Sequence, residues 1–205
     1  MRQTILAFLL FSTISSFAQK LDFGVSFGSG KSYLFESIDK NVNVKYGLPI
    51  SFITEIKFTP KDKNWGVKLR VHNVESTLKG ENWVNKTPLN GYINSITTSL
   101  ILENEIAEKH FSYGFNFGLG LTKETIQQQQ YYSYDKAIQN YTSISVGGHF
   151  THKISENFDF QILPTLLWQD PFKSIGVITG ERKANFAGED LTMTLNFGLL
   201  YRLTK

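Results

Sequence analysis

The chain has 205 residues, 41% of them hydrophobic and 14% aromatic, and it contains no cysteine. Its 21 basic and 18 acidic residues nearly balance and neither sign forms a long run, which argues against a nucleic-acid-binding protein. The length suits one domain, and the lack of cysteine excludes disulfides and an anchor through a lipidated cysteine.

The first segment, residues 1–18, has the features of a secretory signal peptide. Arg2 precedes an apolar run from Ile5 to Phe11, and small residues then lead to Ala18. The run is too short to cross a bilayer as a retained helix, which takes roughly 20 apolar residues, and no later segment is long enough either. We therefore expect cleavage after Ala18 and a mature domain over residues 19–205, which could enter a membrane only as strands.

Eight segments after residue 20 alternate bulky apolar residues with small or polar ones, as a strand with two unlike faces does. In chain order they cover residues 21–28, 48–58, 65–72, 95–103, 111–122, 143–150, 158–168 and 191–203. The fifth is the most regular: its bulky face runs from Phe111 to Leu121, and its other face has only Ser, Gly, Asn and Thr. Small uncharged residues suit a crowded interior, so this strand predicts a barrel with its apolar face outside.

The connections between these segments alternate in length. Those at residues 59–64, 107–110 and 155–157 are short, and those at residues 29–46, 76–91, 123–140 and 169–190 are long and polar. In an up-and-down antiparallel sheet, all the long connections then fall at one end. This is the layout of an outer-membrane barrel with short periplasmic turns and long extracellular loops. The sequence thus predicts an all-β fold, an eight-stranded antiparallel up-and-down transmembrane β-barrel.

Charged residues within the eight segments share the face opposite the bulky one. They are Asp22, Glu55, Lys57, Lys68, Arg70, Glu103, Asp159 and Arg202. Eight strands leave an interior that side chains can just fill, so we expect these charges to form an ion-pair network that plugs it. We also expect Gly114, Gly118 and Gly120 to make room for the charged side chains.

Two further features concern the outward face. Aromatic residues gather near both strand ends, as in the two girdles of a membrane barrel. They are Phe58, Trp65, Phe111, Phe158 and Tyr201 at the short connections, and Trp83, Tyr92, Tyr131, Tyr132, Tyr134, Tyr141 and Trp168 at the long ones. Pro164 lies in the middle of the seventh segment, where it cannot donate a ladder hydrogen bond, so we expect a bulge or a kink there.

The last segment resembles the C-terminal assembly signal of bacterial outer-membrane proteins. Asn196, Gly198, Tyr201 and Leu203 match its polar residue, its glycine and its two spaced bulky residues, although the chain continues to Thr204-Lys205. Together with the signal peptide, residues 19–205 resemble a small Bacteroidota outer-membrane barrel of the porin-family, PorT-like or OmpA/OmpX-like type. The resemblance implies insertion by the barrel assembly machinery and contact with outer-membrane lipids and lipopolysaccharide.

Motifs that carry chemistry are weak in this chain. Gly28-Ser29-Gly30-Lys31-Ser32 lacks the first glycine of a phosphate-binding loop, and His149 and His152 fall on opposite faces of one strand. His72 and His149 are interpreted as interior hydrogen-bonding groups, and the run of glutamines from Gln127 to Gln130 as part of a solvated loop. We assign no catalytic residue, no cofactor-binding residue, no cofactor and no metal ligand.

The leading hypothesis is a non-enzymatic outer-membrane protein of the cell envelope with a filled interior. It would have a structural role, or a role in binding a surface protein or a small ligand at four extracellular loops. A membrane-embedded enzyme that modifies lipid, an open pore and a soluble lipocalin-like binder are the alternatives. The lipocalin-like fold also has eight strands but keeps its apolar face inside.

Overall fold

The computed structural model describes residues 18–33, 42–82, 88–130, 133–171 and 191–203, and these are almost entirely β-strand. The strands are β1 (Ala18–Tyr33), β2 (Val42–Tyr46), β3 (Ile50–Pro60), β4 (Trp65–Asn82), β5 (Pro88–Asn104), β6 (Ile106–Ala107), β7 (Phe111–Gln130), β8 (Ser133–Lys153), β9 (Phe158–Gln169) and β10 (Leu191–Arg202). In this part of the chain, no helix is long and apolar enough to cross a membrane.

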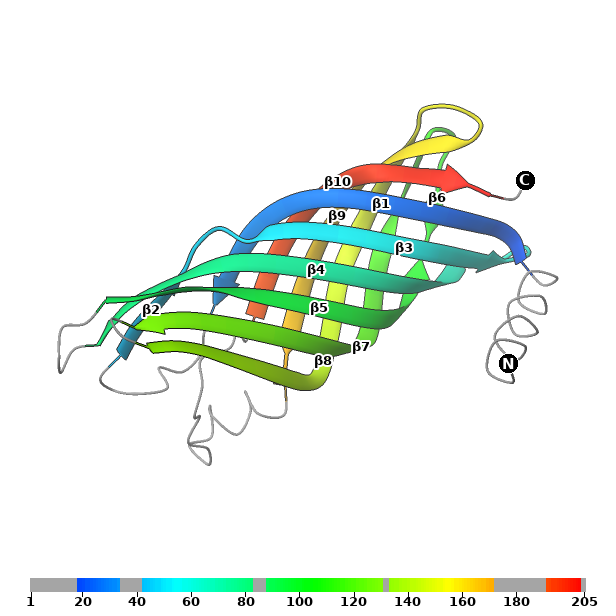
Figure 1. The fold of residues 1–205 in the computed structure, drawn as a ribbon. Coiled ribbons are helices and arrows are strands. Elements are labelled where there is room, and N and C mark those ends of the chain that lie inside the picture. Colours follow the sequence, from blue (N-terminus) through cyan, green and yellow to red (C-terminus); the bar gives the residue numbers. More distant parts are fainter. Residues whose placement is uncertain (1–17, 34–41, 83–87, 131–132, 172–190, 204–205) are drawn as a thin grey trace.

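Eight long strands form a closed antiparallel ring (Figure 1). Their order is β4-β3-β1-β10-β9-β8-β7-β5, and pairing of β5 with β4 closes the ring. The first and last long strands, β1 and β10, are neighbours and pair from Asp22–Arg202 to Tyr33–Leu191. This confirms the predicted eight-stranded up-and-down barrel, to which the described residues add the short strands β2 and β6.

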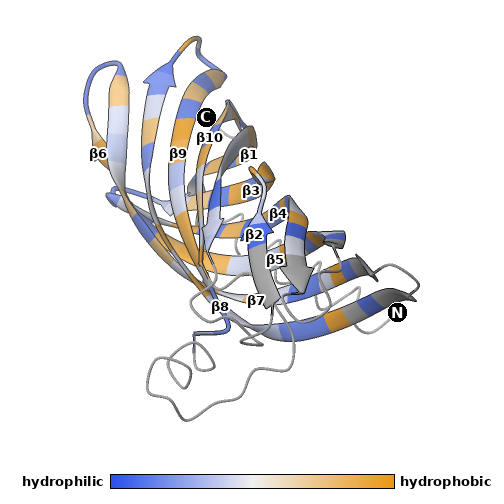
Figure 2. Ribbon diagram, turned by 90° about the vertical axis from the view of Figure 1, so that its left-hand side faces the viewer, coloured by the Kyte–Doolittle hydropathy of each residue, from blue (hydrophilic) through white to orange (hydrophobic). Residues whose placement is uncertain are grey.

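The two faces of the strands point as the alternation predicts. Along β7 the outward residues Phe115, Leu119 and Leu121 are 80%, 61% and 69% exposed, whereas Asn116 between them is buried. Figure 2 shows the same alternation of hydrophobic and hydrophilic residues along the other strands. Because the apolar face is outside and the charges are inside, the soluble lipocalin-like hypothesis is wrong.

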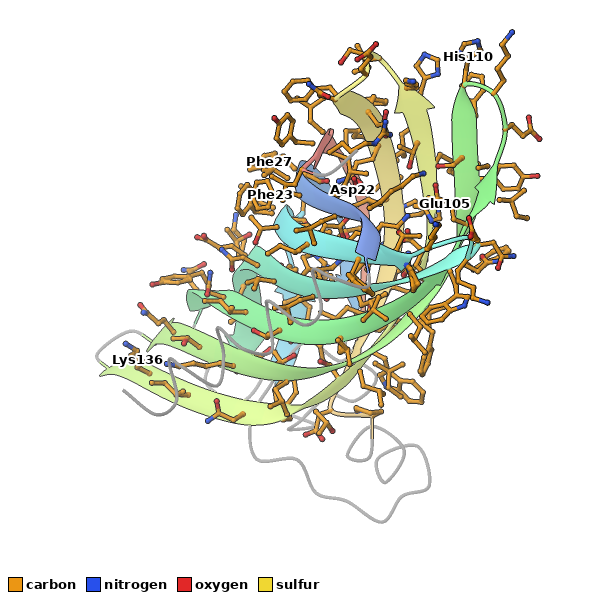
Figure 3. The ribbon with its side chains drawn as sticks, turned by 90° about the vertical axis from the view of Figure 1, so that its right-hand side faces the viewer. Asp22, Phe23, Phe27, Glu105, His110 and Lys136 are labelled. Atoms are coloured by element: carbon orange, nitrogen blue, oxygen red, sulfur yellow. The ribbon has the colours of Figure 1, made fainter. Side chains whose placement is uncertain are left out.

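The short connections lie where the sequence predicts them, at residues 61–64, 108–110 and 154–157. This end of the barrel is called the turn end below, and the opposite end the loop end. Figure 3 places His110 at the turn end and Lys136 at the loop end.

The predicted long connections at residues 76–91 and 123–140 are wrong, because most of these residues continue the strands. β4 runs to Asn82, β5 starts at Pro88, and β7 and β8 are 20 and 21 residues long. A transmembrane strand needs only about 9–11 residues, so these strands pass well beyond the span of a bilayer. These strand ends beyond the apolar band, which we call the extension, are mostly polar on their outer face, a pattern that is also typical of loops. The buried residues Leu78, Ile93 and Ile126 nevertheless pack together inside the extension.

The other long connections are described only in part. β1 continues to Tyr33, and β2 pairs with the far end of β4. After β9 the structure describes only residues 170 and 171 of the connection, and residues 172–190 lie outside the described residues. Residues 1–17 of the expected signal peptide and the final two residues also lie outside, as do Trp83, Tyr131 and Tyr132 of the expected loop-end girdle.

Aromatic side chains do gather at the turn end. Phe158 and Tyr201 pack with their ring centroids 5.0 Å apart, and Phe111 packs against His152 at 4.6 Å. Trp65 is exposed on the same outer face. This part of the predicted aromatic girdle is therefore present.

Of the bulge or kink expected at Pro164, the bulge is wrong, because the pairing register of β9 does not shift there. β8 pairs with β9 from Ser143–Gln169 to Gly147–Thr165 and again, in the same register, from Phe150–Ile162. Only the positions opposite Leu163 and Pro164 are left out, since proline has no N–H to donate. On its other side Pro164 keeps its place opposite Leu195 of β10.

Candidate functional site

A cluster of charged side chains lies inside the barrel near its turn end, and we call it the ion-pair cluster. Its members are Glu55 and Lys57 of β3, Lys68 and Arg70 of β4, Glu103 of β5 and Glu105 just after β5. Alternate residues of a strand face inward, and Glu55 lies opposite Arg70, and Lys57 opposite Lys68, in the β3–β4 register. The adjoining strands therefore bring these side chains together from positions far apart in the sequence.

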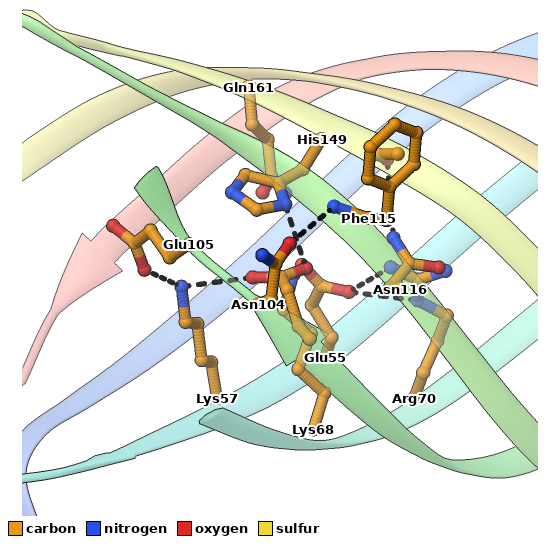
Figure 4. Close-up of polar contacts among 12 residues, drawn as sticks. Glu55, Lys57, Lys68, Arg70, Asn104, Glu105, Phe115, Asn116, His149 and Gln161 are labelled. Atoms are coloured by element: carbon orange, nitrogen blue, oxygen red, sulfur yellow. Dashed lines mark hydrogen bonds and ion pairs between the residues drawn. The ribbon is translucent and has the colours of Figure 1, made fainter. Parts of the chain in front are cut away.

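Glu103 is the centre of the cluster. Figure 4 shows the side chains of Lys57, Lys68 and His149 gathered in this part of the interior. Its Oε1 lies 2.9 Å from Lys57 Nζ, and its Oε2 lies 2.6 Å from Lys68 Nζ. His149 Nδ1, from β8 across the interior, lies 3.2 Å from the same Oε2. Lys57 also pairs with Glu105.

Glu55 continues the chain of ion pairs. Its Oε1 lies 3.1 Å from Lys68 Nζ, and its Oε2 accepts a 2.8 Å hydrogen bond from Arg70 Nε. The order Glu105–Lys57–Glu103–Lys68–Glu55–Arg70 alternates in sign, with three acids and three bases. Such alternation offsets the large cost of burying each charge alone.

The cluster is closed to solvent except at Glu105, whose side chain is 19% exposed. The side chains of Glu55 and Glu103 are 0% exposed, and those of Lys68 and Arg70 are 2% and 1% exposed. The predicted ion-pair network inside the barrel is therefore present, and its side chains occupy the interior at this level. The arrangement can close a lumen, because a solute or ion passing through would have to separate these pairs.

The expected role of Gly114, Gly118 and Gly120 is wrong in its detail. Cβ atoms at Gly114 and Gly118 would come 1.9 Å from Asn104 O and 2.5 Å from Ile101 Cγ1, which belong to β5 and carry no charge. Gly120 likewise lies against uncharged atoms of β5. These glycines permit close approach of β7 to β5.

Two other glycines make room for the charged side chains. A Cβ at Gly24 would lie 2.9 Å from Glu55 Cγ, and one at Gly66 would lie 3.3 Å from Lys57 Cε. Gly24 lies directly opposite Glu55 in the β1–β3 register. The sequence indicated only that some inward-facing glycines leave space for charged side chains. Which glycines do so became clear only from the strand order and the side-chain directions.

A smaller charged group lies at the turn end of β1, β9 and β10. Arg202 Nη2 lies 2.8 Å from Asp159 Oδ2, and Arg202 Nε lies 4.0 Å from Asp22 Oδ1. Asp22 and Asp159 are buried, whereas the Arg202 side chain is 22% exposed. All eight charges predicted to point inward therefore do so.

Towards the loop end the interior is lined by hydroxyl groups. Thr122 Oγ1 lies 2.7 Å from Thr97 Oγ1 and 2.9 Å from Ser143 Oγ, which links β5, β7 and β8. Ser51 Oγ lies 2.7 Å from His72 Nε2, and both residues are buried. This confirms His72 as an interior hydrogen-bonding group. His149 is buried as well, but among the described residues neither of its ring nitrogens forms a hydrogen bond, and its contact with Glu103 is an ion-pair distance.

The Ser51–His72 pair has the residue types of a nucleophile and its base but lacks the rest of a catalytic site. A hydrolase of this kind needs a third group that orients the histidine, and a substrate must reach the serine. Among the described residues no carboxylate forms a hydrogen bond with His72, and Ser51 is 0% exposed. The pair therefore cannot meet a lipid at the outer face of the barrel.

Glu103, Glu105 and His149 each offer one ligand atom, and these atoms lie within 4.8 Å of one another, a spacing that could hold a metal ion. Lys57 pairs with both carboxylates, and Lys68 pairs with Glu103 as well. The two ammonium groups already neutralise these carboxylates and would repel a divalent cation. The donor set therefore does not fit a metal. His152, on the opposite face, is exposed beside Phe111.

Sequence reasoning missed two carboxylates of the interior. Glu105, whose side chain is 19% exposed, lies two residues after Glu103 on the same face, but it falls just beyond the fourth predicted segment. Glu124 is 0% exposed and lies 3.3 Å from Ser95 Oγ, but it falls in the segment interpreted as a connection. The alternation of Glu124 and Ile126 with Thr125 and Gln127 could have indicated that the strand continues.

Solved structures with the same fold are known. The chain matches a major outer membrane protein from Thermus thermophilus at 12% identity and TM-score 0.58, covering 89% of this chain and 99% of that one. It matches the outer membrane protein OprG from Pseudomonas aeruginosa at 13% identity and TM-score 0.53, over 92% and 97% of the two chains.

Neisserial surface protein A matches at 11% identity and TM-score 0.50, over 89% of this chain and 95% of that one. No protein-family model and no curated protein matches. At these identities the likeness shows a shared barrel fold.

Proposed function

We propose that this chain is an integral outer-membrane barrel protein, exported by its N-terminal segment, with a closed interior and no enzymatic activity. The observation that carries the proposal is the division of the barrel wall. Large apolar side chains are exposed outside on every long strand, and the paired charges are buried inside. In water, that exterior would be an exposed apolar surface far larger than soluble monomers tolerate.

The backbone supports the same proposal. A strand can cross a bilayer only if every N–H and C=O group finds a partner, which requires a sheet without edges. The eight long strands meet this condition by closing between β4 and β5. The fold is shared with the outer membrane proteins from Thermus thermophilus and Pseudomonas aeruginosa.

The orientation follows from the two unlike ends. The short turns would face the periplasm, and the extension of β4, β5, β7 and β8 would stand above the outer surface. That extension, with the loops around it, offers the surface for a protein or small-ligand partner. Outer-membrane lipids and lipopolysaccharide would surround the apolar band, and the barrel assembly machinery would receive β10.

Membrane fractionation tests the proposal directly. The full chain should appear in the outer-membrane fraction, resist extraction by carbonate, and migrate differently in electrophoresis before and after boiling. A soluble periplasmic monomer whose migration does not depend on heating would overturn it.

Conductance tests the closed interior separately. Purified protein in a planar bilayer should show no stable single-channel current, because the ion-pair cluster fills the cross-section. Lys68→Met leaves Glu55 with Arg70 and Glu103 with Lys57, and should admit brief ion passage. A stable open level in the unmodified protein would contradict a closed interior without affecting the membrane location.

A further inference from the structure

The outer surface of the barrel is not uniformly convex, because a groove of about 700 Å³ crosses it over β1, β10, β9, β8 and β7. We call this the outer groove. Its floor contains Gly148 and Pro164, and Phe115, Phe150, Leu166 and Met193 rise around them. The volume is within the range of small-molecule pockets, roughly 300–1,000 Å³, although this groove opens sideways and not into the interior.

The groove exists because two small residues meet where the ladder is interrupted. Gly148 would lie opposite Pro164, in the gap left in the β8–β9 pairing. A Cβ at Gly148 would meet only Gly114 O at 3.3 Å and Pro164 Cγ at 3.6 Å, so no side chain fills the space above it. By contrast, Phe115 beside it is 80% exposed and forms a high wall.

One end of the groove carries a positive charge. Lys31 lines the groove and lies opposite Met193 in the β1–β10 register, close to the loop end of β1. Its Nζ lies 5.2 Å from the centre of the Tyr33 ring, two residues further towards the loop end. The ammonium thus reaches towards the level where lipid headgroups lie, as long basic side chains do near a membrane surface.

We propose that the outer groove binds one acyl chain of an anionic lipid, with the headgroup phosphate paired to Lys31. The inference rests on the proposed membrane location, since only there is the groove filled by lipid. Apolar walls suit a hydrocarbon chain, and the single cation at the headgroup end suits a phosphate. A second copy of the barrel would present a convex wall of side chains that bridges the groove without filling it.

The test uses the mature protein purified in a mild detergent and given equal amounts of dioleoyl phosphatidylglycerol and dioleoyl phosphatidylcholine. These two lipids have the same chains, and only the first carries net negative charge. Native mass spectrometry should show one phosphatidylglycerol retained per monomer, in at least tenfold preference to phosphatidylcholine. Equal and weak retention of both lipids would overturn the proposal.

Two variants test the binding of the acyl chain and of the lipid headgroup separately. Gly148→Leu fills the groove and should reduce retention of both lipids at least tenfold, whereas Lys31→Gln should remove the preference between them and leave chain binding. Thr54→Leu adds similar bulk to the outer face of β3, opposite Val25 and Val71 and away from the groove, and should change nothing. Undiminished lipid retention by Gly148→Leu would refute the site.

Phe115→Ala supplies a second variant in case Gly148→Leu does not fold. Phe115 is exposed and its removal lowers one wall, so several-fold weaker lipid retention is expected with normal heat-dependent migration. A dimer that Gly148→Leu abolishes would instead identify a second copy as the occupant and refute the lipid. If the unmodified protein is absent from the membrane fraction, the proposed function is wrong. If it is present there but retains no lipid, only the proposal of lipid binding in the outer groove is wrong.

Discussion

Two walls of this barrel have the same apolar exterior but unlike interiors. The wall of β3, β4 and β5 supplies five of the six members of the ion-pair cluster, and the sixth, Glu105, directly follows β5. The wall of β7, β8 and β9 faces inward mainly with glycine, serine, threonine and amide side chains. Opposite charges must lie within about 4 Å to offset their burial, and adjacent strands place them there. The second wall is then left with little interior volume, and small residues let its strands approach closely.

Removing one charge from the first wall should have the largest effect. Glu103→Gln leaves Lys68 and Lys57 buried with one carboxylate partner each, and should lower the free energy of unfolding by about 3–5 kcal/mol. Urea unfolding in lipid vesicles, followed by tryptophan fluorescence, measures this.

The matched variant on the second wall is Thr165→Val. The Thr165 hydroxyl is buried and has no hydrogen-bond partner among the described residues, so its replacement should change stability by less than about 1 kcal/mol. Equal losses in the two variants would show that the walls do not differ energetically as their charges indicate.

The exteriors of the two walls should respond alike. Leu100, between Leu69 and Leu119 on the neighbouring strands, and Phe117 of β7 both face outward. Leu100→Arg and Phe117→Arg should each cost about 2–4 kcal/mol in a bilayer, because the charge enters hydrocarbon. The same equilibrium unfolding measurement applies.

Ile138→Arg is the control for the exterior variants. Ile138 is 54% exposed in the extension of β8 beyond the apolar band, where an arginine should cost about 0–1 kcal/mol. A loss at Ile138 as large as that at Leu100 would mean that the extension also lies in lipid.

Gly24 packs against the ion-pair cluster and Gly148 does not, so the same substitution should affect them differently. Gly24→Ala would bring a methyl group within 2.9 Å of Glu55 Cγ and 3.0 Å of Gln161 Nε2, and should cost about 1–3 kcal/mol by overpacking. Gly148→Ala, on the outer face, meets nothing closer than 3.3 Å and should change stability by at most about 1 kcal/mol. Thermal unfolding of the two variants in detergent compares their stabilities. A larger loss of stability in Gly148→Ala than in Gly24→Ala would contradict the conclusion that Gly24 leaves space for the ion-pair cluster.

Pro164→Ala should have a small, stabilising effect. It restores an N–H in the gap between β9 and β8 and could add one ladder hydrogen bond, which contributes about 0.5–1.5 kcal/mol. Hydrogen exchange should slow at residues 148 and 149. Unchanged exchange there would show that the gap has another cause than the missing donor.

Much of the fold was predictable from side-chain period. The alternation from Phe111 to Leu121 indicated a strand and its outward face, because successive side chains of a strand point to opposite sides. The extension was not predictable in the same way. Outside the apolar band both faces of a strand can be polar, so polar residues such as Thr125 and Gln127 are also typical of a loop. The structure nevertheless buries Glu124 and Ile126 beside them.

The sequence predicted most members of the ion-pair cluster but not which of them pair with one another. Inward position followed from alternation for Glu55, Lys57, Lys68, Arg70 and Glu103, and both signs together indicated pairing. Glu105 lies two residues after Glu103 and so on the same face, but it falls beyond the predicted segment, and its pairing with Lys57 is seen only in the structure.

By itself, the sequence determined the number of long strands, the end at which the short turns lie and the residues that face each way. These depend on local period and turn chemistry, which short stretches of chain contain. Only the tertiary structure decided that Gly24 and not Gly118 adjoins the charges, and that Gly148 and Pro164 open a groove. Those features depend on which strands become neighbours and in what register, and a one-dimensional pattern does not contain that information.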